Sequence, residues 1–407
     1  MDTNIPYGRQ DINQADIDAV ISVLNSDYLT QGPIVPLFEK TVRDYCGAQY
    51  SVAVNSATSA LHIACLALGV SDGDLVWTTP NTFVATANSA LYCGARVDFV
   101  DIDPRTYNMS IEKLTEKLAW AEKNGELPKV LIPVHMCGQP CDMEAIFNLS
   151  RQYGFKIIED ASHAIGGKYK QNLSKTIPEL AGSALYLYPI GNCKFSDITV
   201  FSFHPVKIIT TGEGGVALTN NEMLAKRLQL LRSHGITSAF SDMSVRPAKE
   251  IWNYQQIALG FNYRMTDIQA ALGVSQMARL DEFVSKRRAI ACRYDELLAN
   301  FPVLTPCQHH DSYSSYHLYV IRLRLDKIQK TQRQVYEAMH KEGVLVNLHY
   351  IPVYRQPYYQ EMGFRDGYCE EAERYYREAL SIPLFPGLSE SQQDRVVTIL
   401  GKALAEG

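Results

Sequence analysis

Short apolar segments rich in β-branched residues alternate with helical patterns through the first half of this 407-residue chain. The segments are hydrophobic without polar alternation, which is typical of strands covered on both faces. They occupy residues 51–55, 74–80, 95–103, 129–135, 155–160 and 198–204, and helices are expected near 57–69, 110–123 and 142–153. This rhythm predicts an α/β fold with a mainly parallel mixed sheet flanked by helices.

The pattern changes after about residue 250 and indicates a smaller C-terminal α+β domain. It predicts a long helix near 265–300, a strand at 317–325, and helices near 331–341 and 389–405, the last two with capping-box starts. We expect an N-terminal arm over 1–15, a large domain over 16–250, and the long helix with the small domain over 251–407. The stretch 171–197, with its Gly, Pro and Tyr residues, is expected to be an irregular excursion loop.

Charge and cysteine usage exclude several classes of protein. A net charge of −5, without any block of Lys or Arg, argues against nucleic acid as a partner. The first twenty residues are polar and acidic, and no apolar run is long enough to span a bilayer, so we expect a cytoplasmic protein without membrane contact. The nine cysteines favour reduced thiols. His135, Cys137 and Cys141 offer only three clustered ligands, so core thiols are favoured over a metal site.

The segment SFHPVKIITTGEGG carries Lys207 directly after the apolar run that ends near residue 204. A single lysine after a strand is usually a solvated charge. Here the apolar and glycine-rich flanks would desolvate the amine, lower its pKa and let the backbone approach a ligand closely. Those are the conditions under which a lysine binds a cofactor covalently.

Asp160 ends the apolar run at 155–160, at the carboxyl end of a strand, where parallel sheets bind ligands. A buried carboxylate at this position needs a facing cation. The protonated pyridine nitrogen of pyridoxal phosphate is such a cation, and a lysine paired with such an aspartate is what this cofactor requires from a protein. The alternative is a helix cap for the following segment, ASHAIGG.

Three further features have both a functional and an ordinary interpretation. The segment NSATSAL, from residue 55, opens a helix whose free N–H groups could bind phosphate, although small residues there also serve as caps. Phe83 could stack on a flat ring or could be a core side chain. Asn262, in the polar cluster Asn-Tyr-Arg before the long helix, is either a helix cap or faces another polar group.

Together these segments resemble the DegT/StrS family of sugar aminotransferases, within the fold-type I pyridoxal-phosphate enzymes. The likeness covers almost the whole chain, through IPYGRQDI, LNSDYLTQGP, TTPNTFVATANS, DIDPRTYNM, EDASHAIG, LRSHG, LGFNYRMTDIQAALG, VNLHYIPVYRQPYY and SIPLFPGLS. Its most specific string is SFHPxK followed by GEGG. The stretch 171–197 is longer than the family norm. Some relatives carry histidine in place of the lysine and are dehydratases, and Lys207 argues against that activity here.

The resemblance implies roles for individual residues. Lys207 would carry pyridoxal 5'-phosphate, Asp160 would face its ring nitrogen, and Phe83 would stack on the ring. His163 would lie near the 3-oxygen. The phosphate would be held by Ala57, Thr58, Ser202 and, from the neighbouring subunit, Asn262. Contacts to the nucleotide sugar are implied for Tyr7, Asp27, Tyr28, Leu29, Thr30, His349 and Tyr350.

The implied reaction moves an amino group from L-glutamate to C4 of a UDP-linked 4-keto-6-deoxy-N-acetylhexosamine, as in pseudaminic acid biosynthesis, in a homodimer with shared active sites. Amination at C3, or of a dTDP- or GDP-linked sugar, stays open. A nicotinamide-dependent sugar dehydrogenase is a competing class, but NSATSAL lacks its glycine fingerprint. A cofactor-binding regulator would have a DNA-binding module and a basic face, and the sequence shows neither.

Overall fold

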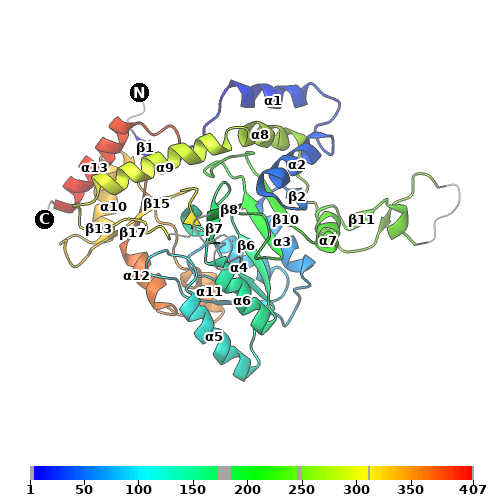
Figure 1. Ribbon diagram of the computed structural model, residues 1–407, viewed down its shortest axis with the longest axis horizontal. Helices are drawn as coiled ribbons and strands as arrows, with labels where there is room; N and C mark the ends of the chain where they lie inside the picture. The colour runs from blue at the N-terminus through cyan, green and yellow to red at the C-terminus, as the bar shows by residue number, and fades with distance from the viewer. Residues whose placement is uncertain (1–3, 173–184, 245–249, 310–311, 406–407) are drawn as a thin grey trace.

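A seven-stranded sheet forms the centre of the computed structural model, which describes residues 4–172, 185–244, 250–309 and 312–405 (Figure 1). Strand β10 runs antiparallel to both neighbours, and the other pairs are parallel, which confirms the predicted mainly parallel mixed sheet. In spatial order the strands are β2 (Tyr50–Val54), β10 (Gly215–Thr219), β9 (Ile198–Ser202), β6 (Lys156–Asp160), β5 (Val130–Ile132), β3 (Leu75–Thr78) and β4 (Arg96–Phe99).

Helices cover both faces of this sheet because successive strand residues point to opposite sides. Ile157 of β6 belongs to one buried core and its neighbour Ile158 to the other. The first core includes residues of α2 (Ile34–Cys46), α5 (Ile111–Asn124), α6 (Met143–Tyr153), α8 (Asp267–Met277) and the start of α9 (Leu280–Leu297). The second includes residues of α3 (Ala57–Ala67), α4 (Val84–Leu91), α7 (Glu222–Arg232), η5 (Val353–Arg355), α11 (Pro357–Glu361) and α12 (Glu370–Glu378).

A third core lies in the C-terminal part of the chain, around a three-stranded sheet of order β13-β15-β17. It includes Ile5, because β1 (Ile5–Pro6) pairs with β16 (Val344–Leu345) and so joins the beginning of the chain to this part. The other elements here are β13 (Val303–Leu304), β15 (Tyr319–Leu323), α10 (Gln332–Lys341), β17 (Ala379–Ile382) and α13 (Glu390–Ala405). The division of the chain at residue 250 stays a proposal.

The prediction of one long helix near 265–300 is wrong, because the chain forms two helices there. Helix α8 ends before Ala278, and α9 begins after Arg279, whose backbone leaves the helical conformation. The guanidinium of Arg279 donates to Asp11 and Asp16, at the beginning of the chain. These contacts with α1 (Gln14–Leu24) and the residues before it join segments distant in sequence, so a local pattern does not reveal them.

The stretch expected to be an irregular loop contains regular structure at its edges. Strand β7 (Lys168–Asn172) pairs with β8 (Leu185–Pro189) in an antiparallel hairpin, and β14 (Ser312–Tyr313) pairs with the other edge of β7. Residues 173–184, between the two strands, lie outside the described part of the chain. The prediction of an irregular loop is therefore wrong for residues 171–172 and 185–189.

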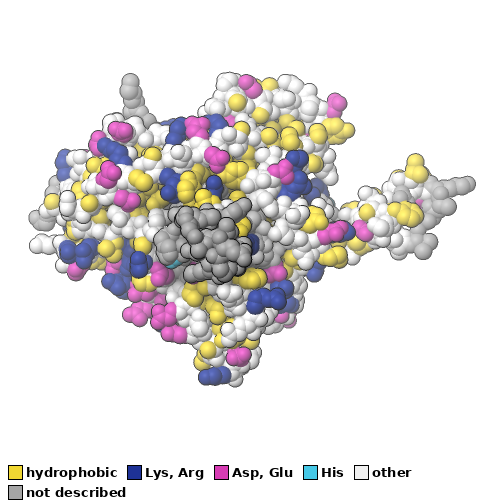
Figure 2. Space-filling view, in the orientation of Figure 1, with side chains coloured by type: hydrophobic (Ala, Val, Ile, Leu, Met, Phe, Trp, Pro, Cys, Tyr) yellow, Lys and Arg dark blue, Asp and Glu magenta, His cyan; other side chains and the backbone are white. Residues whose placement is uncertain are grey.

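An arm projects from the body beyond α7, through β11 (Ile236–Thr237), η4 (Phe240–Asp242) and β12 (Gln255–Gln256) (Figure 1). Hydrophobic side chains are visible along it (Figure 2). The most exposed are Phe240 at 77%, Ile251 at 89%, Trp252 at 74% and Leu259 at 80%. None of the described helices combines the length and apolar composition needed to cross a bilayer.

Candidate active site

Lys207 ends a turn that follows β9. Its N–H donates to the carbonyl of His204 at 2.9 Å, and the N–H of Phe203 donates to Gly214 at 3.0 Å, so the lysine turn lies against the glycine-rich segment. The side chain is half-buried. Burial lowers the pKa of Lys207 from 10.5 to about 8, although the charge of Asp160 opposes this shift. The site therefore holds an amine that exchanges a proton near neutral pH.

Asp160 lies at the end of β6 and is buried. Its carboxylate accepts a hydrogen bond from the hydroxyl of Thr86 at 2.7 Å and from the N–H of Ser162 at 3.1 Å. The described residues 161–167 form turns and no helix begins there, so the helix-cap interpretation of Asp160 is wrong. Two donors leave acceptor capacity on this carboxylate for a cationic partner.

Three histidines surround this centre. His163 receives or donates a hydrogen bond at 3.0 Å between Nε2 and the hydroxyl of Tyr350, while its buried Nδ1 has no partner among the described residues. His317 packs against it with ring centroids 4.4 Å apart. Burial and the charge of Lys207 hold the pKa of His163 well below its usual range and lower the pKa of His349 to about 3. The imidazoles are therefore neutral at physiological pH.

The same cluster contains three residues that were predicted to bind the substrate, Tyr7, His349 and Tyr350. The ring of Tyr7 lies 5.0 Å from that of His349, whose Nδ1 is 2.8 Å from the hydroxyl of Ser381. Phe83 lies 6.2 Å from the ring of Tyr350 and is 57% exposed. Because the ring of Phe83, at the start of α4, is exposed, the interpretation of Phe83 as a core side chain is wrong. The ring is available to cover a flat ligand.

The start of α3 lies at the same end of the sheet. Ser56 caps the helix through the N–H of Ser59, so the N–H groups of Ala57 and Thr58 begin the helix. A Cβ on Gly215 would lie 2.5 Å from the Ala57 nitrogen, and glycine is therefore required for β10 to approach the helix start. Ser202 ends the neighbouring strand β9 and is buried. A helix start of this kind binds phosphate well.

Leu29 and Thr30 contact the start of α8, four to five positions after Asn262 in the chain. The backbone of Asn262 bridges Ser233, and its side chain is exposed. Thr266 caps α8 in a capping box with Gln269, so the interpretation of Asn262 as that cap is wrong. Thr30 bridges Thr266. Asp27, Tyr28 and Leu29 are exposed along the same segment, and their role in substrate binding stays a prediction.

Two residues of the site escaped the sequence analysis. Thr86 lies one helical turn beyond Phe83, on α4, and His317 lies just before β15. A threonine within an alanine-rich helix was a weak signal for the first. No local pattern distinguishes His317 from an ordinary polar residue at a strand start.

The described residues fit pyridoxal phosphate. The amine of Lys207 has a lowered pKa, Asp160 has free acceptor capacity, and the unpartnered Nδ1 of His163 can bind a ring oxygen. The start of α3 and the exposed ring of Phe83 suit a phosphate and a flat ring. The roles of the individual residues stay predictions.

A model of the DegT/DnrJ/EryC1/StrS aminotransferase family matches residues 10–401. The chain belongs to this family. It is 37% identical to the UDP-4-amino-4,6-dideoxy-N-acetyl-beta-L-altrosamine transaminase of Campylobacter jejuni, over 93% of this chain and 92% of that protein. Among solved structures it is similar to Helicobacter pylori PseC, an aminotransferase involved in the biosynthesis of pseudoaminic acid, with a TM-score of 0.85, 29% identity and coverage of 98% and 99% of the two chains.

The PLP form of Spr1654 from Streptococcus pneumoniae is also similar, with a TM-score of 0.83, 27% identity and coverage of 99% of this chain and all of the other. The chain is therefore a pyridoxal-phosphate-dependent sugar aminotransferase. The fold class predicted from the sequence is confirmed, and so are the family, the enzyme class and the cofactor.

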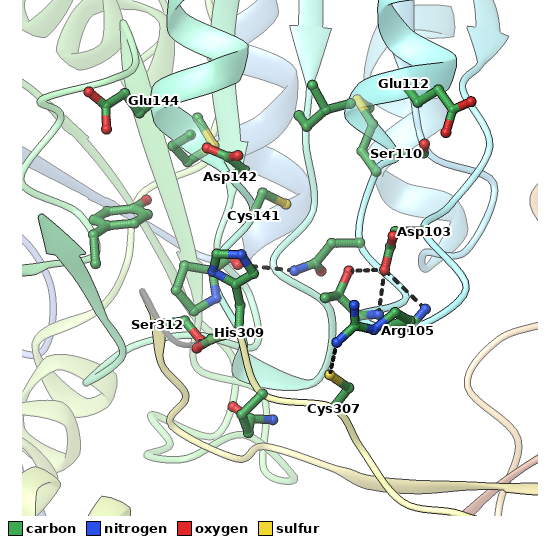
Figure 3. Close-up of a pocket in the computed structure, with 18 of the residues that line it drawn as sticks. Asp103, Arg105, Ser110, Glu112, Cys141, Asp142, Glu144, Cys307, His309 and Ser312 are labelled. Carbon is green, nitrogen blue, oxygen red and sulfur yellow. Dashed lines mark hydrogen bonds between the residues drawn. The ribbon is translucent and has the colours of Figure 1, made fainter.

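Both ring nitrogens of His135, the histidine close in sequence to Cys137 and Cys141, have hydrogen-bond partners within the protein. Its Nδ1 accepts the N–H of Cys141 at 3.1 Å, and its Nε2 is 2.8 Å from Glu159. A cavity of about 700 Å³ opens nearby, and Cys141 lines it (Figure 3). Tyr169 lines it as well. Asp103 and Asp142, which also line it, accept hydrogen bonds from the backbone of their own loop or helix.

Proposed function

We propose that the enzyme transfers an amino group from L-glutamate to C4 of a UDP-linked 4-keto-6-deoxy-N-acetylhexosamine, as in pseudaminic acid biosynthesis. The observation that supports the chemistry is the half-buried Lys207 amine, with its lowered pKa, beside the buried carboxylate of Asp160. The choice of substrate is supported by the likeness, over more than nine tenths of the chain, to the Campylobacter transaminase and to PseC.

Asp160 and Lys207 have different roles in the proposed reaction. When bound, pyridoxal phosphate supplies an electron sink for the negative charge left when a proton is removed from the amino donor. Asp160 holds a proton on the ring nitrogen through its charge. Lys207 Nζ removes the proton from the α-carbon of the donor and, in the second half of the cycle, delivers a proton at C4 of the sugar. We expect ping-pong kinetics, because the amino group stays with the enzyme after the keto-acid product has left and before the sugar nucleotide binds.

A panel of keto-sugar nucleotides tests the substrate. The purified enzyme, pyridoxal phosphate and L-glutamate are incubated with UDP-, dTDP- and GDP-linked sugars that carry a ketone at C3 or C4, and products are identified by mass spectrometry and NMR. We expect turnover to be fastest with the UDP-linked 4-keto-N-acetyl sugar. Faster turnover of a dTDP- or GDP-linked sugar, or amination at C3, would contradict the proposed substrate but not the aminotransferase class.

We further propose that the working unit is a homodimer in which Asn262 binds the cofactor phosphate of the partner subunit. The side chain of Asn262 is exposed, and its backbone bridges Ser233, the residue that follows α7 where the arm begins. The arm carries exposed apolar residues, and so does the outer face of α1, at Ile17 and Ile21. Exposed apolar surface of this kind marks protein interfaces, and a two-fold dimer would supply the contact twice.

Mixing two inactive variants tests the shared site. Lys207→Ala and Asn262→Ala are denatured, combined and refolded, and hybrid dimers are counted by native mass spectrometry. One of the two sites in a hybrid contains both wild-type residues, so we expect up to half of the wild-type activity per hybrid. Hybrids that form but stay inactive would refute the shared site, as long as Asn262→Ala alone is inactive.

A further inference from the structure

The residue next to Asp160 is a second buried carboxylate, on the opposite face of the sheet. Glu159 and Asp160 are consecutive residues of β6, so their side chains point to opposite sides. Asp160 meets Thr86 of α4 on the side of the second core. Glu159 meets residues on the side of the first core, where it is 1% exposed. A buried carboxylate is costly unless donors satisfy it.

Four side chains donate to Glu159. His135 Nε2 lies 2.8 Å from Oε2, and the hydroxyl of Tyr169 also donates to that oxygen. Oε1 accepts from the hydroxyls of Ser196 at 2.5 Å and Thr199 at 3.1 Å. Because Nδ1 of His135 accepts the N–H of Cys141, the ring hydrogen is on Nε2 and points at Glu159. Burial raises the pKa of Glu159, but these donors more than offset it and hold the pKa below its ordinary value.

These donors come from the segments that position the active site. Glu159 pairs with Thr199 in the register of β6 and β9, and β9 leads to Lys207. The backbone N–H of His135 donates to the carbonyl of Asp160 at 3.0 Å. Tyr169 lies on β7, at the base of the hairpin with β8, and lines the same cavity as Cys141. One carboxylate therefore ties together β6, β9, the hairpin and the segment around His135.

We propose that Glu159 and Tyr169 are positioning residues that hold the end of β6, and with it Asp160, from the face of the sheet opposite the cofactor. The inference rests on the proposed role of Asp160 at the ring nitrogen. A shift of about 1 Å in a group of this kind costs up to roughly 100-fold in rate. Within the described part of the chain, the hydrogen bonds of both side chains lie on the face opposite the cofactor, so both act through the strand.

Tyr169→Phe removes one donor and leaves the ring in place. We expect it to weaken the binding of pyridoxal phosphate to the cofactor-free protein, and to lower kcat, each by about tenfold, with little change in KM for the amino donor. Ser196→Ala should act in the same direction. The matched control is Tyr45→Phe, which removes a tyrosine–carboxylate hydrogen bond of 2.7 Å to Asp281 away from β6. It should lower Tm by less, because this hydrogen bond is exposed, and it should leave cofactor binding unchanged.

A double-variant cycle with Asp160→Asn decides whether the effect passes through Asp160. If it does, Tyr169→Phe weakens cofactor binding in the wild-type background and adds nothing in the Asp160→Asn background. An equal loss in both backgrounds, or a change in Tm alone, would overturn the inference. If Asp160→Asn by itself leaves cofactor binding and the absorption spectrum unchanged, the proposed role of Asp160 is wrong. This outcome can be distinguished from a failure of the positioning inference, because it is measured with Asp160→Asn alone.

Discussion

The free amine of Lys207 should capture pyridoxal phosphate at a much lower pH than an ordinary lysine does. Only the unprotonated amine attacks an aldehyde, and burial lowers the pKa of Lys207 from 10.5 to about 8. At pH 7 roughly one amine in ten is then neutral, against roughly one in 3,000 at the ordinary pKa, a difference of roughly 300-fold. We expect the capture rate to rise with pH up to about 8 and to level off above it, because the neutral form then predominates.

The assay mixes cofactor-free protein with pyridoxal phosphate between about pH 6 and about pH 10, a window that spans both pKa values. The covalent product is trapped with borohydride at intervals and quantified on the peptide that contains Lys207. Nα-acetyl-lysine, which keeps its side-chain amine and is treated in the same way, corrects for the titrations of the cofactor itself. The charge of Asp160 raises the pKa of Lys207, so Asp160→Asn should move the midpoint to a lower pH. The reasoning would be refuted if the pH midpoint of capture by the wild-type protein were close to that of Nα-acetyl-lysine. It would also be refuted if Asp160→Asn moved this midpoint to a higher pH.

Three further predictions concern the support of the site. Arg287→Met removes a buried guanidinium that donates to three backbone carbonyls, and it should lower the free energy of unfolding by about 2–4 kcal/mol in urea titrations. Gly215→Ala places a Cβ 2.5 Å from the Ala57 nitrogen, so it should weaken cofactor binding in equilibrium titrations more than it lowers Tm. Thr86→Val removes a hydrogen bond to Asp160, and steady-state kinetics should show about tenfold lower kcat. Unchanged kcat would mean that Thr86 only fills space.

Signals within a few residues of one another predicted much of the fold correctly. Asp142 caps α6, and Gly154 ends it in the left-handed conformation with φ of 83°. Thr331 and Gln334 form the expected capping box at α10. Such signals are reliable because both partners of the interaction lie in the same turn. The break between α8 and α9 was missed, because Arg279 forms ion pairs with Asp11 and Asp16, more than 260 positions away.

In the candidate site, too, some features follow from the local sequence and others depend on the tertiary structure. Sequence by itself determined that Asp160 ends a buried strand and that Lys207 follows one, because an apolar run followed by polar and glycine residues is a local pattern, and the ends of parallel strands meet at one edge of a sheet. Only the tertiary structure decided which partners face them. Thr86 reaches Asp160 across 74 positions, Tyr350 reaches His163 across 187, and Glu159 is satisfied by donors from three separate segments. Side-chain contacts of this range depend on how layers pack, and packing is a property of the whole chain rather than of any window of its sequence.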